Sequence, residues 1–474
     1  MFFFSVVFKL LTVNEKLYFS TDFEVHRNWM AITHSLPFSE WYKEARNVWT
    51  LDYPPFFAYF EYIISQVAVL VDPAMVNVDN INYASWHTIA FHRFSVMLLS
   101  DFLLAVGVWM ILPPPKRILG LILALFSSSL FVVDHIHFQY NGMLLGLMLI
   151  SAALVEREQF LLGAAAYMTL VWTKHIFLFC APVYFVYFLT QYVSRASGLG
   201  KQVLRLVALV AVVVGVSAVA LIPIIRTDQL GAMIERLFPF GRGLVHSYWA
   251  PNFWALYSGL DRFLGTIIRV LNGTSTPIGP SIMMILPPVS PFAALLCTLA
   301  GYVVLLTLLQ RARKVPFIIW VGLGNAVAFA FGWHVHEKAV LMILFPLQMG
   351  GLAGGNGARL VSASKIWRLS VVANVAVMPL LFRRQEVVLN WVLLATGAAL
   401  QAYWLDIDLS DQKRWILAAV APQFYGDFLH THLLSNKLWF LPLAFNSVAS
   451  AILLTQSLLT VARRIELADK PKAV

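Results

Sequence analysis

Long hydrophobic runs separated by short polar segments fill this chain from end to end. A transmembrane helix needs about 20 consecutive apolar residues, and runs of about that length recur near 93–112, 203–225, 289–309 and 439–461. With the shorter runs between them, the pattern predicts an all-α polytopic membrane protein with about 12–14 transmembrane helices. We expect the first span to end near Phe19.

Composition agrees with this pattern, because 59% of the residues are hydrophobic and only 12% are charged, far from the composition of soluble domains. The formal charge of +10 does not indicate nucleic-acid binding, since the basic residues stand in short clusters such as Lys116-Arg117. Such clusters between apolar runs are typical of cytoplasmic loops. The two cysteines, Cys180 and Cys297, lie in apolar runs, so we expect neither disulfides nor a cysteine metal site.

Four polar segments interrupt the apolar pattern, at about 20–62, 134–141, 226–252 and 332–338. Ionisable side chains at a membrane boundary are costly in lipid and indicate functional sites. The first segment interleaves charges with tryptophans, which predicts an interfacial loop. The third contains several Gly and Pro residues, which predicts an irregular loop rather than a helix.

Two acidic residues of the first polar segment, Asp22 and Asp52, lie where a carboxylate can accept a proton from a hydroxyl group. The alternative is a structural role, either as a helix cap or in a salt bridge to Arg27 or Arg46.

A single charge inside an apolar run is a different case. Lys174 interrupts the run at 160–193, which we expect to be one broken helix or two short ones. Its side chain pairs with Asp101, which could also pair with Arg93, or Lys174 or Arg93 faces a lipid phosphate.

Two H-x-H pairs, His135/His137 and His334/His336, are weak evidence for a metal, because residues two apart diverge by about 200° on a helix. We expect hydrogen-bonding or anion-binding histidines and no metal site. The D-x-D at 406–408 is predicted to be a solvated helix end.

Two markers bear on sidedness. Asn272-Gly273-Thr274 forms a glycosylation sequon. The C-terminal Lys470 and Lys472 have the form of a retrieval signal for the endoplasmic reticulum, with a solvated basic tail as the alternative.

Several long motifs carry a resemblance: DFEVHRNW, WTLDYPPFFAYFEY, DHIHFQYNG, HSYWAPNFWALY and FGWHVHEKAVL. Together they resemble the dolichyl-phosphate-glucose-dependent alpha-1,3-glucosyltransferases of N-glycan precursor assembly. HRNW and HSYWAPNFWALY look most like the members that add the second glucose.

The resemblance implies a GT-C fold in the endoplasmic reticulum membrane, with a luminal active site and a luminal first loop. The donor would be dolichyl phosphate glucose, and the acceptor Glc1Man9GlcNAc2 on dolichyl pyrophosphate. Asp22, in the DFE motif, would be the general base of an inverting transfer. His336, in the HEK motif, would lie near the donor phosphate.

Such a reaction needs no cofactor, because cationic side chains can stabilise a phosphate leaving group. The candidate substrate-binding residues are His336, Lys338, His334, Arg27, Asp52, Arg242, His246, Trp249 and Lys174.

We expect residues 1–360 to form the catalytic membrane module, including loops 20–55 and 226–252. Residues 361–474 would add C-terminal helices and a cytosolic tail. The alternatives are a first-glucose or other dolichyl-phosphate-sugar transferase, and a polyprenyl-lipid transporter. Transporters usually contain internal repeats, which we do not find, and the polar residues gather in loops instead. We also expect membrane lipids to surround the protein.

Overall fold

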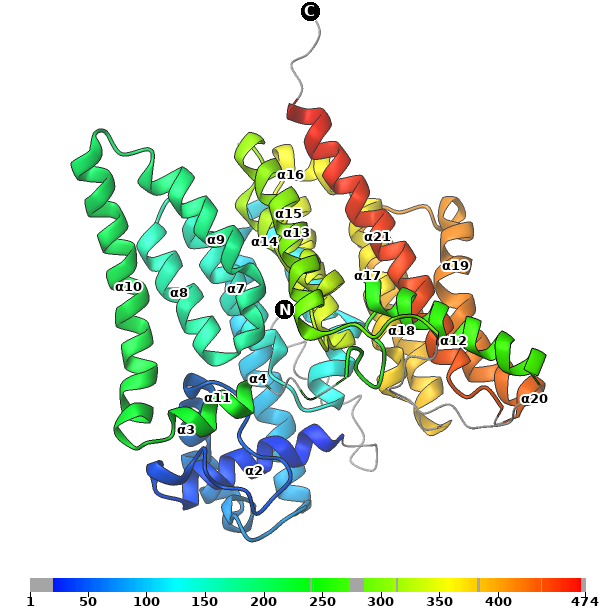
Figure 1. The fold of residues 1–474 in the computed structure, drawn as a ribbon, viewed down its shortest axis with the longest axis horizontal. Coiled ribbons are helices and arrows are strands. Elements are labelled where there is room, and N and C mark those ends of the chain that lie inside the picture. The colour runs from blue at the N-terminus through cyan, green and yellow to red at the C-terminus, as the bar shows by residue number, and fades with distance from the viewer. Residues whose placement is uncertain are drawn as a thin grey trace, which may run out of the picture. The chain divides into compact units, whose positions relative to one another are not determined.

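The computed structural model describes residues 20–238, 241, 243–272, 285–312, 314–381, 384–435 and 437–469. The chain divides into two compact units, Met1–Pro239 and Phe240–Val474. Every regular element among the described residues is a helix (Figure 1). The predicted first span, the sequon residues after Asn272 and the two C-terminal lysines lie outside the described residues. The expected division at 360 concerns function and stays a prediction.

The α-helices of the first unit are α2 (Thr21–Ser35), α3 (Pro55–Val71), α4 (Trp86–Ile111), α5 (Pro114–Leu125), α6 (Ser128–Leu130), α7 (Asn141–Glu156), α8 (Phe160–Thr173), α9 (Ala181–Phe188), α10 (Leu199–Arg226) and α11 (Leu230–Leu237). Its 3₁₀ or π segments are η1 (Phe38–Glu40), η2 (Pro73–Val76), η3 (Phe131–Ile136), η4 (His175–Cys180) and η5 (Leu189–Val193).

The α-helices of the second unit are α12 (Phe253–Asn272), α13 (Pro291–Arg311), α14 (Phe317–Phe331), α15 (Leu341–Leu352), α16 (Gly355–Leu360), α17 (Ala363–Val377), α18 (Arg384–Leu405), α19 (Lys413–Phe424), α20 (His430–Leu434) and α21 (Leu441–Asp469). Its 3₁₀ or π segments are η6 (Glu337–Val340), η7 (Met378–Leu380), η8 (Leu409–Gln412) and η9 (Tyr425–Leu429).

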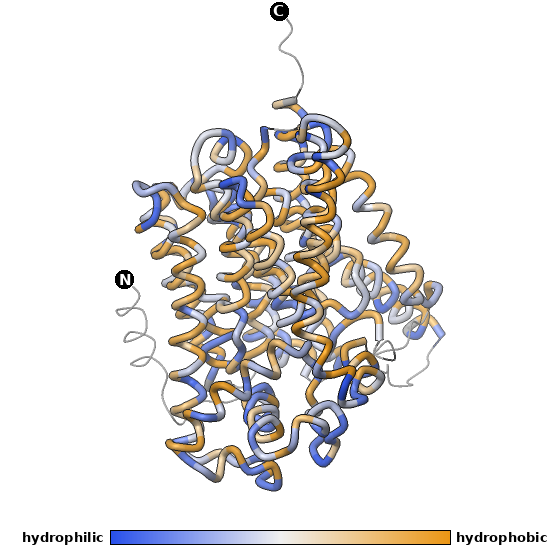
Figure 2. Tube along the Cα trace, turned by 90° about the vertical axis from the view of Figure 1, so that its left-hand side faces the viewer, coloured by the Kyte–Doolittle hydropathy of each residue, from blue (hydrophilic) through white to orange (hydrophobic). Residues whose placement is uncertain are grey.

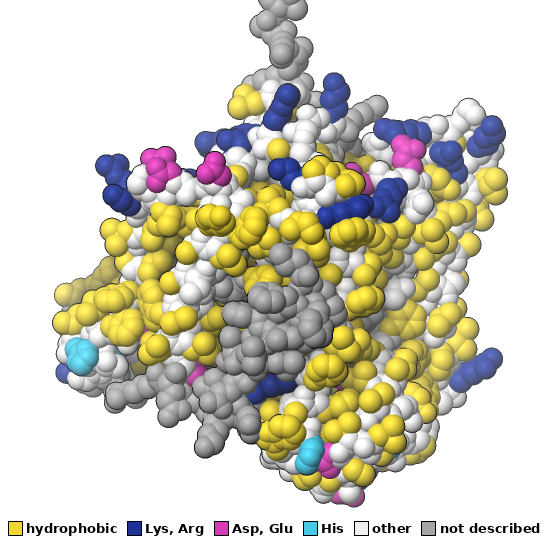
Figure 3. Space-filling model, turned by 180° about the vertical axis from the view of Figure 1, so that it is seen from behind, with side chains coloured by type: hydrophobic (Ala, Val, Ile, Leu, Met, Phe, Trp, Pro, Cys, Tyr) yellow, Lys and Arg dark blue, Asp and Glu magenta, His cyan; other side chains and the backbone are white. Residues whose placement is uncertain are grey.

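Among the described residues, six helices are long and apolar enough to cross a membrane: α4, the continuous stretch His175–Val193, α10, α13, α18 and α21. The pair α5 and α6–η3, bent by 41°, adds a seventh candidate, and α3, α7, α8 and α14 are shorter apolar helices. Figure 2 shows that hydrophobic residues dominate along these helices. In Figure 3, hydrophobic side chains cover much of the visible face, and Lys and Arg gather near its upper edge. These findings confirm the predicted all-α polytopic membrane protein.

The first polar segment does not begin as a loop, because helix α2 starts at its second residue. Ser20 caps the helix by accepting a hydrogen bond from the backbone N–H of Asp22 at 3.2 Å. Asp22 and Glu24 lie in the first turn, where negative charge suits the helix dipole. Leu36 ends the helix in an extended conformation before Pro37, as is usual for a residue that precedes proline.

The predicted irregular loop at 226–252 is partly wrong, since it contains helix α11. Leu230, Met233 and Leu237 recur at the spacing of one helical face, and Met233 and Leu237 are buried. The apolar spacing outweighs the Gly residue inside this stretch.

Two local predictions are confirmed. Helix α8 ends at Thr173, Lys174 adopts an extended conformation, and a 3₁₀ helix begins at His175, so the run at 160–193 is broken. Asp408 is exposed and caps η8 by accepting a hydrogen bond from the Ser410 N–H at 2.7 Å.

Close helix packing in the first unit depends on glycine. Helix α4 packs against α7, and a Cβ added to Gly146 would lie 2.3 Å from the carbonyl carbon of Leu103. In the second unit, α14 packs against α15, and the connection between them carries the polar segment at 332–338.

Candidate functional site

Asp22 is a partly exposed carboxylate in the first turn of α2, and its side chain is 29% accessible. Its Oδ2 accepts a hydrogen bond from the Nε2 of Gln139 at 2.5 Å, and the Nδ1 of His137 lies 3.8 Å from the same oxygen. The Ser20 hydroxyl donates to the carbonyl of His137 at 2.9 Å. The start of α2 is therefore tied to the polar segment at 134–141.

The polar segment at 134–141 turns sharply before α7. Phe138 has a φ of 59°, and α7 begins at Asn141. The Asp134 carboxylate accepts hydrogen bonds from the backbone N–H groups of Asn141 at 2.9 Å and Gly142 at 2.6 Å. It thereby satisfies two of the amide groups that a helix N-terminus leaves without partners.

The side-chain amide of Asn141 connects three polar groups. Its NH₂ donates to Asp134 Oδ1 at 2.9 Å and to Gln139 Oε1 at 2.8 Å. Its oxygen accepts a hydrogen bond from the Nζ of Lys174 at 3.2 Å. That Nζ also lies 4.8 Å from the centroid of the Tyr53 ring, within the range of a cation–π contact.

Two other predicted residues of the first unit have different surroundings. Arg27 is fully buried; it pairs with Glu24 at 2.6 Å and donates to the carbonyl of Met75 at 3.0 Å. These contacts support a structural role for Arg27. Asp52 is half-buried in the irregular segment that leads to α3.

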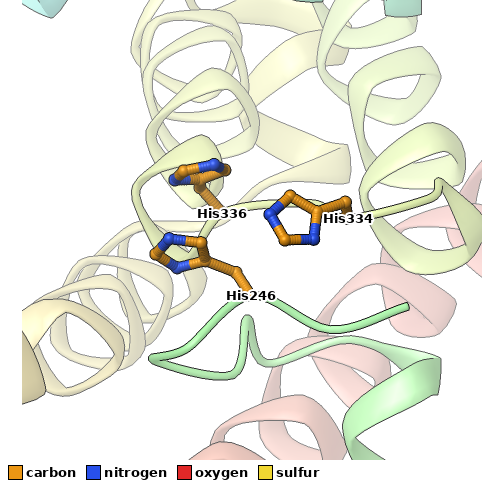
Figure 4. A group of neighbouring side chains, drawn as sticks. All are labelled: His246, His334 and His336. Atoms are coloured by element: carbon orange, nitrogen blue, oxygen red, sulfur yellow. The ribbon is translucent and has the colours of Figure 1, made fainter. Parts of the chain in front are cut away.

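Three histidines lie together in the second unit (Figure 4). His334 and His336 come from the connection between α14 and α15, and His246 from the segment before α12. The backbone N–H of His334 donates to the Leu244 carbonyl at 3.1 Å, which joins the two segments.

Each of two rings is held through its Nδ1. In His334 this nitrogen lies 2.6 Å from the Gly243 carbonyl, and in His246 it lies 3.1 Å from Oε2 of Glu337. A carbonyl and a carboxylate only accept hydrogen bonds, so both Nδ1 atoms carry the proton. In a neutral ring, Nε2 is then the acceptor nitrogen.

Glu337 is the buried anion of this cluster, with 1% of its surface accessible. Burial by itself would raise the pKa of its carboxyl group. The hydrogen bond from His246 and the charges of His246 and Lys338 outweigh burial, so the pKa lies below its ordinary value.

The residues present fit an anion better than a metal ion. One nitrogen from each of the three rings lies within 4.8 Å of the others, and three imidazoles are a donor set that zinc accepts. However, the rings of His246 and His336 are stacked, with centroids 3.8 Å apart and planes 25° apart. Nitrogen lone pairs lie in the ring plane, so stacked rings do not aim at one point. A phosphate has several oxygens and can accept from each ring separately when both nitrogens of that ring carry a proton.

The remaining predicted site residues of the second unit differ in their surroundings. Lys338 is half-buried next to Glu337. Trp249 is buried in an apolar cluster with Ala255, Phe440 and Ala444, which favours a packing role. The predicted Arg242 lies outside the described residues.

Sequence reasoning missed Gln139, Asn141 and Glu337 as site residues. Gln139 and Asn141 stood in a polar segment next to an apolar run, and this was the available signal. Their partners are far away in the sequence, and only the fold brings them together.

The comparisons with known proteins agree with one another. Residues 5–461 match the ALG6, ALG8 glycosyltransferase family. A mouse protein named dolichyl pyrophosphate Glc1Man9GlcNAc2 alpha-1,3-glucosyltransferase is 40% identical over 410 residues, covering 80% of this chain and 77% of its own. A protein of the same name from Arabidopsis thaliana is 37% identical, and the match covers 94% of this chain and 94% of that protein. Another from Schizosaccharomyces pombe is 38% identical, and the match covers 92% of this chain and 91% of that protein. The chain therefore belongs to the ALG6, ALG8 glycosyltransferase family.

Proposed function

We propose that this protein transfers glucose from dolichyl phosphate β-D-glucose to Glc1Man9GlcNAc2 on dolichyl pyrophosphate, in α-1,3 linkage. The names of the mouse, Arabidopsis and fission-yeast relatives carry this proposal, since they state the acceptor and the linkage. The chain is a multi-pass membrane glycosyltransferase of the GT-C type. N-glycan precursor assembly implies the endoplasmic reticulum membrane, with the active site on the luminal side.

Asp22 is the proposed general base. It takes the proton from the 3-hydroxyl of the terminal acceptor glucose, and that oxygen attacks the anomeric carbon of the donor from the face opposite the phosphate. The bond between C1 and the phosphate oxygen breaks, and dolichyl phosphate leaves with the electron pair. The β-linked donor thereby gives an α product. The accessible carboxylate of Asp22 and its hydrogen-bonded support favour this role.

The three histidines are the proposed site for the donor phosphate, with His336 as the main contact and Lys338 as an additional cation. Charge builds on the phosphate oxygen as the bond to glucose breaks, and cationic donors held in place stabilise it. Glu337 supports this role by orienting the ring of His246. Such a site stabilises the leaving group through fixed charges alone.

The first experiment is glucose transfer by the purified protein from synthetic dolichyl phosphate glucose. We expect a product one hexose heavier with the Glc1Man9GlcNAc2 lipid, no product with the Man9GlcNAc2 lipid, and full activity in EDTA. Product only from the Man9 lipid would indicate the first-glucose reaction. Absence of transfer from any dolichyl-phosphate sugar would overturn the proposal and favour a lipid transporter.

The role of the base is tested with Asp22→Asn. We expect a loss of about 10²–10⁴-fold in kcat, the usual contribution of a general base. A matched control is Asp427→Asn, because Asp427 also accepts hydrogen bonds from a glutamine amide, that of Gln423 at 2.9 Å. A folded Asp22→Asn protein with normal turnover would remove Asp22 from the mechanism.

The phosphate site is tested with His336→Ala, for which we expect about 10²–10³-fold lower activity. The matched control is His430→Ala, whose ring is bound to Tyr425 at 2.9 Å. Unchanged donor kinetics in the His336 variant would exclude it from the phosphate site.

A further inference from the structure

We propose that Lys174, Asn141 and Gln139 form a directional hydrogen-bond chain that positions the carboxylate of Asp22. In this chain Lys174 fixes which way both amide groups face. The inference rests on the proposed function, in which Asp22 is the general base. It gives Lys174 a positioning role, in place of the donor-phosphate contact that the sequence indicated.

The direction of the chain follows from its charged ends. An ammonium group only donates hydrogen bonds, so the Nζ of Lys174 must face the amide oxygen of Asn141, at 3.2 Å. The amide NH₂ of Asn141 is then turned toward Asp134 and Gln139, at 2.9 and 2.8 Å. The carboxylate of Asp134 only accepts, so it demands the same orientation.

The second amide is fixed by the first. The oxygen of Gln139 accepts from Asn141, so its NH₂ is left to donate to Oδ2 of Asp22. Reversal of either amide would place a donor against a donor or an acceptor against an acceptor. A cation at one end and a carboxylate at the other therefore define one arrangement, and successive bonds in such a chain strengthen one another.

The chain is anchored in buried parts of the first unit. Gln139 is 4% accessible and Asp134 is fully buried. Asp134 is bound to the two backbone N–H groups at the start of α7. Lys174 stands at the break between α8 and η4, where the extended backbone ends one helix before the next begins. A base held by such a frame keeps its orientation when the acceptor hydroxyl arrives.

Other charged groups also act on this region. His137 lies 3.8 Å from Asp22. The Tyr53 ring next to Lys174 interacts electrostatically with Asp52, Asp134 and Glu61. His175 follows Lys174 in the chain. A test of the chain must leave these charges in place, so its main variant exchanges one neutral residue for another.

That variant is Gln139→Leu, measured in the purified full-length protein by kcat, KM and the pH–rate profile. The hydrogen bond from Gln139 stabilises the charged form of Asp22 and its orientation. We expect kcat to fall about 10–100-fold, the usual effect of losing a hydrogen bond to a charged group, with little change in either KM. We also expect the acidic limb of the profile to move to higher pH.

The matched control is Gln423→Leu in the second unit. The Nε2 of Gln423 donates to both carboxylate oxygens of Asp427, at 2.9 and 3.0 Å. This pair has the same kind of amide–carboxylate contact as Gln139 and Asp22 but no connection to Asp22. We therefore expect Gln423→Leu to leave the kinetics unchanged. A second variant, Gln139→Glu, keeps the shape of the side chain and places a like charge beside Asp22, so the acidic limb should move further up than in Gln139→Leu.

The far end of the chain is tested with Lys174→Met. Its control is Arg205→Met, which also removes a cation 4.8 Å from a tyrosine ring, that of Tyr192. We expect Lys174→Met to lower kcat as Gln139→Leu does. We expect the double variant Lys174→Met/Gln139→Leu to be no slower than the slower single variant, because both changes break one chain.

The outcomes separate this inference from the proposed function. If Asp22→Asn retains turnover, the proposed base is wrong. If Asp22→Asn is inactive but Gln139→Leu and Lys174→Met behave like their controls, only the hydrogen-bond chain is overturned. A rise in the donor KM of Lys174→Met with unchanged kcat would also overturn it, because that result belongs to a phosphate ligand. Thermal unfolding of each variant identifies any that fail to fold.

Discussion

The ion pair between Arg27 and Glu24 offers a direct test of how burial decides the strength of a charge contact. Arg27 is fully buried, and its guanidinium donates to both oxygens of Glu24, at 2.6 and 2.8 Å. Asn47 donates to the same carboxylate at 2.9 Å. Glu24→Gln keeps the size of the side chain and one accepting oxygen, but it leaves the charge of Arg27 without its counter-ion.

The magnitude follows from that burial. Removal of one partner of a buried ion pair costs about 3–5 kcal/mol, and the oxygen that glutamine retains places Glu24→Gln near the lower figure. A domain of 150–250 residues loses about 2–4 °C in Tm for each kcal/mol. The first unit is in this range, so we expect a fall of about 6–12 °C.

An exposed ion pair provides the control. Arg46 and Asp79 are 2.8 Å apart, closely similar to the buried pair, but their side chains are 48% and 72% accessible. Exposed pairs contribute about 0–1 kcal/mol, so Asp79→Asn should lower Tm by at most about 4 °C. Thermal unfolding of both variants in the same detergent gives the comparison. Equal shifts in the two variants would refute the reasoning, and a stable Glu24→Gln protein with a raised KM would favour a substrate-binding role for Arg27.

Two further predictions concern stability. The pKa of Glu337 is lowered in the folded protein, so its contact with His246 stabilises the fold above the ordinary carboxyl pKa and is lost as pH falls through the lowered value. Tm should therefore decline below about pH 4, and less steeply in Glu337→Gln; equal slopes in both proteins would contradict this. Gly146→Ala places a methyl group 2.3 Å from a backbone carbon of α4 and should cost about 1–3 kcal/mol or more. In the control Gly215→Ala, the new methyl group lies in open space beside α10, so this change should be neutral or stabilise the protein by up to about 1 kcal/mol. Similar Tm values for the two alanine variants would show that α4 and α7 can separate without cost.

The fold class could be predicted from the sequence because it depends on local pattern. Apolar runs of spanning length define the helices, and a charge at Lys174 was enough to predict the break between α8 and η4. Helix α11 was missed although its apolar residues recur at helical spacing, because Gly and Pro around it were given more weight. Both outcomes concern residues that interact within a few positions of each other.

The supporting residues of the site could not be predicted in this way. Gln139 and Asp22 are 117 positions apart, and their contact exists only because the start of α2 meets the polar segment that precedes α7. The amide of Asn141 has no chemical signature of its own, and its role depends on which groups surround it. The sequence indicated the acidic residue and the polar segment, but not the hydrogen bonds between them.

The histidines show why a motif alone does not define chemistry. The H-x-H spacing occurs twice, yet His135 is buried with its Nε2 3.5 Å from Asp101, whereas His336 is half-buried and stacked on His246. Neither partner belongs to the motif. His135 is enclosed beside a carboxylate, whereas His336 is accessible and belongs to the cluster that we propose as the phosphate site. The chemistry of each pair is therefore set by burial and by residues distant in the sequence. The H-x-H motif predicts neither.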